Sequence, residues 1–474
     1  MHFSSLYGEY GIGSMGKEAR EFVDFLSDSG FGVWQVLPFC MTDECNSPYK
    51  SAAAFSFNPY FVDLEVLLER GYLKKSELCE ARCEDKYLCR YDLLKEKRLP
   101  LLFSAAMRAY ENKAEREAVA DFCEKNPLTA EAAYFLALRD KNKLLPWQKW
   151  QAQSPDESRL FFWQFIQYEF CRQWLEIKAY ANKKGVKIIG DIPIYVSFDS
   201  ADVFFRPHNF LLDKRGIPTE VAGVPPDYFS SEGQLWGNPI YNYKKMKEDG
   251  FSWWRERIRH TLTIFDGARI DHFRGLDAYW SIPYGAKSAA EGKWKKAPSA
   301  DILKALCDEA GEGLLIAEDL GDIDDGVRRL RDKFRLPGMR VFEFAFLGDK
   351  DSPHLPHNYI NNSVAYTGTH DNNTLLGYLF ECDVHTRARI FDYCGYAGSS
   401  IDEGLHSVIR TLLSSSAGLV IFPIQDILGF GSDTRMNTPA KAEGNWAYRV
   451  TKEQIKSIDT VNLRHLNELY GRIL

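Results

Sequence analysis

The chain has 474 residues, with 59 Lys and Arg against 66 Asp and Glu, and a formal net charge of −7 at pH 7. This length rules out a small disulfide-stapled fold, and the mixed charge excludes nucleic acid and anionic membrane surfaces as expected partners. Hydrophobic residues make up 45% of the chain, which is typical of a soluble globular protein. The aromatic content of 14% is high, and aromatic rings serve either a core or the stacking of sugars, bases or peptides.

The chain start, MHFSSLYGEYGIG, lacks the basic and apolar regions of a secretory signal, and no later run resembles a membrane span. We therefore expect a cytoplasmic protein. The ten cysteines are scattered and form no paired Cys-x-x-Cys pattern, so reduced thiols and no metal site are expected.

Short apolar runs bounded by glycine or proline recur along the chain and predict strands that are buried on both faces. Seven such runs lie at 32–38, 186–191, 267–271, 313–318, 339–346, 363–369 and 418–425, and a first strand is predicted near 2–6. Amphipathic helical patterns separate most of them, for example at 299–309 and 323–333. The predicted fold is an α/β protein, a (β/α)8 TIM barrel. A doubly wound sheet is the competitor, but no Gly-x-Gly-x-x-Gly follows the first strand.

Two segments interrupt the alternation of strands and helices. Residues 64–155 have a helical pattern and predict an inserted subdomain, whereas 195–253 is rich in proline, glycine and aromatic residues and predicts a loop-rich insertion near the active site. The expected organisation is one catalytic domain over 1–474 that contains both insertions.

Acidic residues stand at the ends of four predicted strands: Asp191, Asp271, Glu318 and Asp371. A single acid at such a place is most often a helix cap or an ion-pair partner. Four acids at one mouth of a barrel would repel one another unless they share protons, bind a cation or stabilise a developing positive charge.

Two chemistries use such a cluster. In glycosyl transfer, one carboxylate attacks the anomeric carbon and a second, protonated carboxyl releases the leaving oxygen. In an enolising barrel, three carboxylates hold Mg²⁺ beside a Lys or His base, but Lys187 lies at the wrong end of its strand for that role. Arg269, two residues before Asp271 on the same face, is expected to keep that carboxylate charged.

Three motifs then carry a resemblance to a known family: RID (269–271), AEDLG (317–321) and TGTHDNNT (367–374). They resemble the catalytic motifs of the 4-α-glucanotransferases (amylomaltase or disproportionating enzyme) of the α-amylase clan. Further matching strings are YGIG (10–13), WQVLP (34–38), SPY (47–49), NPYFVDL (58–64), GDIPIYV (190–196), AGVPPDYFS (222–230), GQLWGNP (233–239), and MNTP with GNWAYR (436–449).

The resemblance implies a retaining 4-α-glucanotransferase that acts on maltooligosaccharides and α-1,4-glucans without a cofactor. Asp271 would be the nucleophile, Glu318 the general acid/base and Asp371 the stabiliser of the distorted sugar. The substrate-binding residues that it implies are Arg269, His370, Asp191, Tyr49 and Trp236.

The sequence departs from the family pattern at two places, the stretch FCMTDECN after Pro38 and Ala440 after Pro439. No β-sandwich domain is expected after the barrel. The rivals that remain open are an α-glucan hydrolase, a noncatalytic glucan-binding protein and the metal-dependent enolising barrel. We favour transfer over hydrolysis because Tyr228, Phe229, Trp236 and Tyr241 offer stacking faces that could cover the site.

Overall fold

The computed structural model describes residues 1–226 and 232–473. Its centre is a parallel sheet of seven strands whose order is β1-β2-β5-β8-β9-β10-β11. The strands are β1 (Val33–Gln35), β2 (Lys187–Ile192), β5 (Gly267–Ile270), β8 (Leu314–Ala317), β9 (Gly338–Val341), β10 (Ser363–Tyr366) and β11 (Leu419–Ile421). Each coincides with one of the seven predicted runs, and the sheet curves into a nearly closed barrel. The predicted TIM-barrel fold class is therefore confirmed.

The predicted first strand near 2–6 is wrong. Phe3–Ser5 form a 3-10 helix there. The Leu37 backbone N–H donates to the His2 imidazole at 3.2 Å, and Trp34 Nε1 donates to the Met1 carbonyl at 2.8 Å, so side chains replace a strand ladder beside β1. The N-terminal segment lies near both edge strands, since Met1 lines a cavity together with residues of β1 and β11.

Buried apolar residues on β2, β8, β9 and β10 pack together inside the barrel, as expected for a parallel sheet of this kind. This inner cluster consists of Ile189, Ile316, Met339, Val341, Val364 and Tyr366. The helices pack outside the strands. They include α1 (Lys17–Asp28), α8 (Glu157–Lys183), α11 (Ser252–Ile264), α12 (Ser299–Ala310), α13 (Asp325–Lys333), α14 (Leu375–Glu381), α15 (Val384–Tyr393), α16 (Ile401–Leu413), α17 (Ile424–Leu428), α18 (Lys452–Ser457) and α19 (Thr460–Leu469).

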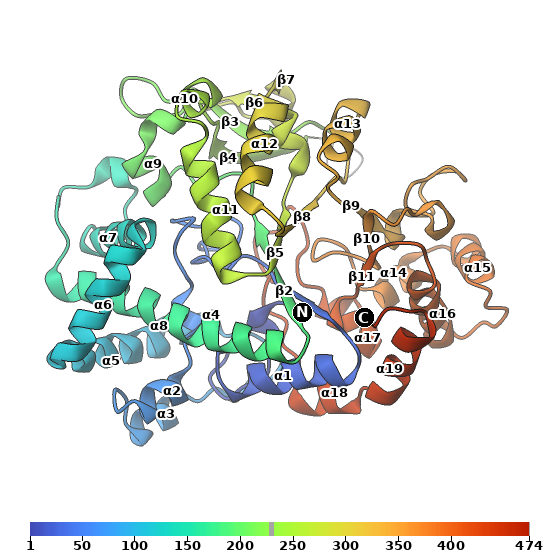
Figure 1. Cartoon of the computed structure of the whole chain (residues 1–474), viewed down its shortest axis with the longest axis horizontal. Coiled ribbons are helices and arrows are strands. Elements are labelled where there is room, and N and C mark those ends of the chain that lie inside the picture. Colours follow the sequence, from blue (N-terminus) through green and yellow to red (C-terminus); the bar gives the residue numbers. More distant parts are fainter. Residues whose placement is uncertain (227–231, 474) are drawn as a thin grey trace.

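Helices occupy much of residues 64–155, and Figure 1 shows α5, α6 and α7 together at one side of the barrel. Those in this segment are α2 (Leu64–Glu69), α3 (Lys75–Ala81), α4 (Tyr91–Leu93), α5 (Leu99–Glu111), α6 (Lys113–Lys125) and α7 (Pro127–Lys141). Their apolar side chains, such as Leu102 and Phe135, belong to the same buried cluster as Trp174 of α8 and Ile188 of β2. The segment thus shares its core with one flank of the barrel.

Residues 195–253 contain more regular structure than the sequence indicates. They form α9 (Ala201–Phe205), α10 (Tyr243–Glu248), β3 (Glu220–Val224) and β4 (Gln234–Pro239), and the two strands join β6 (Ala278–Pro283) and β7 (Lys293–Lys296) in an antiparallel sheet. Figure 1 shows this second sheet at the top of the molecule. The sequence pattern did not indicate these strands because they carry glycine and proline, and because one of the two partners of β3, strand β6, lies more than fifty residues further along the chain.

Candidate active site

The barrel strands place the predicted catalytic and substrate-binding side chains at one end of the sheet. Asp191 and Arg269 are register partners on β2 and β5, and Asp271 and Glu318 directly follow the paired residues Ile270 and Ala317. A cleft of about 500 Å³ opens above these strand ends. Seven of the eight predicted residues line it: Tyr49, Trp236, Arg269, Asp271, Glu318, His370 and Asp371. The eighth, Asp191, is buried beneath them.

Arg269 is the centre of a buried polar network. Its guanidinium lies 2.7 Å from Asp191 Oδ2 and 2.8 Å from Asp271 Oδ1. The Tyr49 hydroxyl donates to the same Asp191 oxygen at 2.6 Å and accepts from Arg269 at 3.2 Å. The side chain of Asp191 is completely buried, whereas that of Asp271 is 29% exposed. Asp191 therefore acts as a counter-charge that orients Arg269, and Asp271 is the partner that faces the cleft.

The expected contact between Arg269 and Asp271 is present, but its electrostatic consequence differs from the sequence-based expectation. Burial raises the pKa of Asp271 above its ordinary value, the charge of Asp371 adds to this, and the Arg269 guanidinium opposes it. The positive partner limits the rise and does not reverse it, because removing a carboxylate from water is costly. Asp271 is thus less acidic than an exposed aspartate.

Glu318 differs from Asp271 in its surroundings. Its Oε2 accepts the His272 backbone N–H at 2.6 Å, and its Oε1 accepts the Leu320 N–H at 3.3 Å. Burial, followed by the negative charge of Asp271, raises the pKa of Glu318 well above its ordinary value. Two neighbouring carboxyls that share one cleft then titrate as a pair, in which Glu318 holds a proton more firmly than Asp271 does.

Asp371 lies in the loop after β10, and its side chain is half exposed. Asn437 Nδ2 donates to Asp371 Oδ1 at 2.6 Å, and Arg435 donates to the Asp371 backbone carbonyl at 2.5 Å. Neither residue was assigned a role from the sequence, although Asn437 belongs to the MNTP string. They connect the loop that carries Asp371 to the chain segment that closes the far side of the cleft.

Aromatic rings form the walls of the cleft. The rings of Tyr49 and His370 are stacked, with centroids 5.1 Å apart and planes at 14°. Trp236 of β4 meets the His272 ring edge to face at 4.9 Å. Burial lowers the pKa of His370, which keeps this imidazole neutral. The cleft therefore offers flat apolar faces together with neutral hydrogen-bonding groups, which suits the two sides of a sugar ring.

Two of the aromatic residues expected to cover the site, Tyr228 and Phe229, lie outside the described residues. A third, Tyr241, belongs to the core: its exposed fraction is 1% and its hydroxyl donates to the Ile194 carbonyl at 2.7 Å. Of the four proposed covering residues, Trp236 is the one that the structure places in the cleft.

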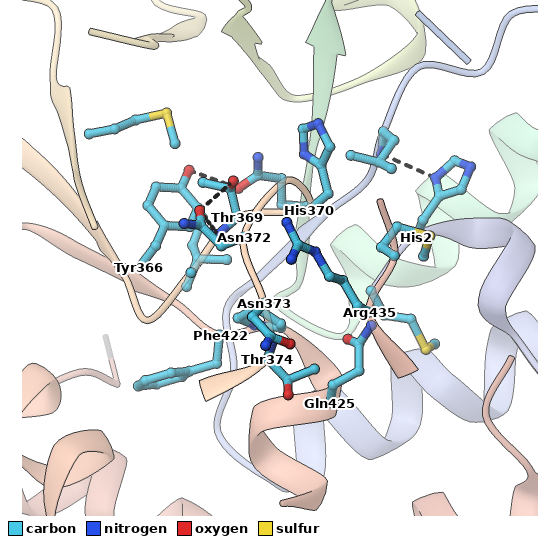
Figure 2. A pocket seen from close by; sticks show the side chains of 18 of the residues that line it. His2, Tyr366, Thr369, His370, Asn372, Asn373, Thr374, Phe422, Gln425 and Arg435 are labelled. Carbon is cyan, nitrogen blue, oxygen red and sulfur yellow. Dashed lines mark hydrogen bonds between the residues drawn. The ribbon is translucent and has the colours of Figure 1, made fainter. Parts of the chain in front are cut away.

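A second, smaller cavity of about 100 Å³ shares Arg269, Thr369 and His370 with the cleft. Figure 2 shows side chains that line this cavity. Tyr366, His370, Gln425 and Arg435 line it, together with His2 of the N-terminal segment. Asp271, Glu318 and Asp371 are absent from its described lining and line the larger cleft instead.

Within residues 1–226 and 232–473, no cluster of three or more His, Cys, Asp or Glu side chains has an arrangement that could hold a metal ion. In the same ranges, no helix is long and apolar enough to cross a membrane.

A parallel barrel with three carboxyl groups gathered at its strand ends, two of them with raised pKa values, is typical of the class of enzymes that cleave and form glycosidic bonds. The model of one such family, described as 4-alpha-glucanotransferase, matches residues 1–455. The chain belongs to this family.

Relatives in the family match the chain from end to end. A 4-alpha-glucanotransferase of Synechocystis sp. is 41% identical over 493 residues, which cover 100% of this chain and 97% of that protein. One from Thermus thermophilus is 41% identical over 497 residues, covering 100% of this chain and 98% of that protein. Among solved structures, the amylomaltase from Streptococcus agalactiae in complex with acarbose superposes with a TM-score of 0.96 at 35% identity, covering 100% of this chain and 99% of that one.

Proposed function

We propose that the chain is a retaining 4-α-glucanotransferase that moves α-1,4-glucan segments from a maltooligosaccharide or starch-like donor to the 4-hydroxyl of an acceptor glucan or glucose. The observation that supports it best is the unequal setting of two carboxyls in one cleft. Asp271 is paired with Arg269 at 2.8 Å, while Glu318 is held by the backbone N–H groups of His272 and Leu320. In a chain of this family, that pair supplies a nucleophile and an acid.

The proposed reaction has two halves. Asp271 Oδ attacks the anomeric carbon as Glu318 gives its proton to the departing glycosidic oxygen, which leaves as a free 4-hydroxyl. In the second half, the 4-hydroxyl of the acceptor gives its proton to Glu318 and displaces Asp271 from the same carbon. Two inversions yield net retention, and each group returns to its starting state.

The other cleft residues have binding roles in this proposal. Asp371, fixed by Asn437, grips the hydroxyls of the distorted donor sugar, and its negative charge stabilises the cationic transition state. Tyr49 and Trp236 provide stacking faces, and His370 provides a neutral hydrogen-bonding group. Arg269 and Asp191 act on the substrate indirectly in this proposal. Arg269 holds the Asp271 carboxylate, and Asp191 holds the Tyr49 hydroxyl.

We also propose that residues 1–474 form one catalytic domain, with 64–155 as its helical inserted subdomain and 195–253 as an insertion beside the active site. Trp236 in the cleft wall supports the second assignment.

The ten cysteines are all free thiols in the structure, which supports a cytoplasmic location for the protein.

Hydrolysis would need the same carboxyls, so the ratio of transfer to hydrolysis tests the choice of acceptor. With millimolar maltotriose, we expect transfer to exceed hydrolysis at least about tenfold, a difference of ~1.4 kcal/mol in barrier height. The measurement compares formation of glucose and longer oligosaccharides with the appearance of new reducing ends, which hydrolysis alone creates. Reducing ends that rise as fast as glucose would establish the hydrolase instead.

The raised pKa values of both carboxyls predict a bell-shaped pH dependence of kcat/KM for transfer. Activity falls on the acidic side as Asp271 takes up a proton, at a pH above the ordinary pKa of an aspartate. It falls on the alkaline side as Glu318 loses its proton, and this limb lies well above the ordinary pKa of a glutamate. Initial rates on maltotriose across the pH range measure both limbs. An alkaline limb near the ordinary glutamate pKa would contradict the assignment of Glu318 as the acid.

A metal-dependent enolising barrel is tested by chelation. Because the proposed steps use carboxyl groups alone, dialysis against EDTA is expected to leave the transfer rate within about a factor of two. A loss of activity that Mg²⁺ restores would favour the enolising reaction, and binding of maltotriose without any turnover would favour a noncatalytic glucan-binding protein.

A further inference from the structure

The residue that follows the nucleophile has an unusual backbone conformation. His272 has φ 47° and ψ 48°, in the left-handed region, and caps the 3-10 helix Phe273–Leu276 two residues after the end of β5. Few residues other than glycine adopt this region, and residues branched at Cβ are strongly disfavoured there. Such conformations tend to persist at functional sites, where the surrounding structure holds them.

This turn aims backbone N–H groups at the acid/base residue. The His272 N–H donates to Glu318 Oε2 at 2.6 Å, and the next N–H, that of Phe273, donates to the Glu318 carbonyl at 3.2 Å. Glu318 in turn donates its own N–H to the Ile270 carbonyl at 3.1 Å. In an extended strand, successive N–H groups point in opposite directions, so two consecutive donors to one residue require the chain to turn at His272.

The two carboxyl oxygens of Glu318 are held unequally. Oε2 has the short bond to His272, whereas the Leu320 N–H lies 3.3 Å from Oε1. A carboxylic acid accepts hydrogen bonds best at its carbonyl oxygen and carries its proton on the other oxygen. The short donor therefore favours Oε2 as the carbonyl oxygen and leaves Oε1 to carry the proton.

We propose that the left-handed turn at His272 is a positioning device for Glu318, which fixes the carboxyl through the backbone and places the transferable proton on Oε1. The inference rests on the proposed function, because it presumes that Glu318 is the acid/base. In this proposal, His272 acts on Glu318 through the backbone of the turn. Its imidazole side chain does not take part and lines the cleft instead.

Three charged residues act on Glu318: Arg269 of β5, Asp271 just after this strand, and the neighbouring Asp319. Asp371 acts on the site through Asp271. Burial also lowers the pKa of the His272 imidazole to about 4, so this ring adds no charge at neutral pH. Within this set, the His272 N–H favours the ionised form of Glu318 and so lowers its pKa. Loss of that bond should move the alkaline limb of the pH profile to higher pH.

The test compares His272→Val with His272→Gly. Both variants lose the imidazole, but glycine adopts φ 47° freely and valine opposes it. We expect kcat on maltotriose to be at least about thirtyfold lower for valine than for glycine, with KM within threefold. His272→Asn, which also tolerates this conformation, should have the same kcat as the glycine variant. The kcat of His272→Ala should lie between those of the valine and glycine variants, and the alanine variant replaces the valine variant in the comparison if the latter does not fold.

A second measurement separates proton transfer from general damage. The fluoride burst from α-maltosyl fluoride reports attack by Asp271 on a leaving group that needs no proton, so we expect the valine and glycine variants to differ there by less than about threefold. The alkaline limb should lie at higher pH for valine than for glycine.

Arg335 provides the matched control, since it is exposed, has φ 55° and lies at the end of α13, away from the cleft. Arg335→Val should lower the melting temperature relative to Arg335→Gly but leave kcat and the pH profile unchanged. Equal kcat and pH profiles for His272→Val and His272→Gly would overturn the proposal. If the unmodified protein makes neither glucose nor longer products from maltotriose, the proposed function fails, which is a separate outcome.

Discussion

Asp271→Asn is expected to lower transfer from maltotriose by about 10⁴-fold or more, because an amide cannot form the covalent ester with the anomeric carbon. Such a loss corresponds to at least about 5 kcal/mol in the barrier. The fold should persist, since an amide oxygen at this position can still accept the hydrogen bond from Arg269. The measurement is the initial rate of glucose release, with the melting temperature as a check of folding.

Asp322 supplies a matched control for this variant. It is an exposed aspartate in the loop after Glu318 and is absent from the described lining of the cleft. Asp322→Asn should therefore leave the rate within about twofold, as is usual for surface substitutions. If folded Asp271→Asn keeps more than about a tenth of the unmodified activity, Asp271 is not the nucleophile.

Glu318→Gln should separate the two halves of the reaction. On maltotriose, we expect a loss of about 10³-fold or more, since no acid protonates the leaving oxygen. On α-maltosyl fluoride the first half should survive, because fluoride leaves without a proton. The second half should be slow, since no base receives the acceptor's proton. We expect a burst of fluoride release equal to the enzyme concentration, followed by slow turnover.

The same variant tests whether Glu318 accounts for the alkaline limb. Burst amplitude and rate with the fluoride substrate should not decline at the alkaline pH at which the unmodified enzyme loses activity on maltotriose. Equal losses on the two substrates would show that Glu318 serves the structure and not proton transfer.

The barrel and its strand-end acids could be predicted because their signals are local. Seven apolar runs bounded by glycine or proline mark the seven strands, and residues at parallel strand ends converge at one edge of the sheet. Asp271 and Glu318 could therefore be placed together from their positions after two neighbouring strands. Tyr49 and Trp236 come from segments outside the barrel sheet, so their assignment to the substrate site depended on the resemblance to the family.

The features that escaped prediction depend on distant contacts. The segment at 2–6 has the composition of a strand, but buried aromatic packing and the His2 imidazole make a 3-10 helix the better partner for β1. The antiparallel sheet pairs β3 with β6 across more than fifty residues that include β4, α10, α11 and β5, and no local periodicity reveals this pairing. Arg435 and Asn437 reach Asp371 from more than sixty residues away.

The direction of the Asp271 pKa shift shows a further limit. An arginine two residues earlier indicated a carboxylate held charged, and the ion pair is present. The sequence does not show how deeply that pair is buried, and burial exceeds the effect of the guanidinium.

The central claim is that donor sugar passes through a covalent bond to Asp271. The most direct test is the mass of Glu318→Gln protein after brief incubation with α-maltosyl fluoride, followed by mapping of the modified peptide. We predict that one maltosyl group is added per chain, on the peptide that contains Asp271, and that adding maltotriose slowly removes it. An unmodified chain that still releases fluoride, or a maltosyl group on another residue, would contradict this account.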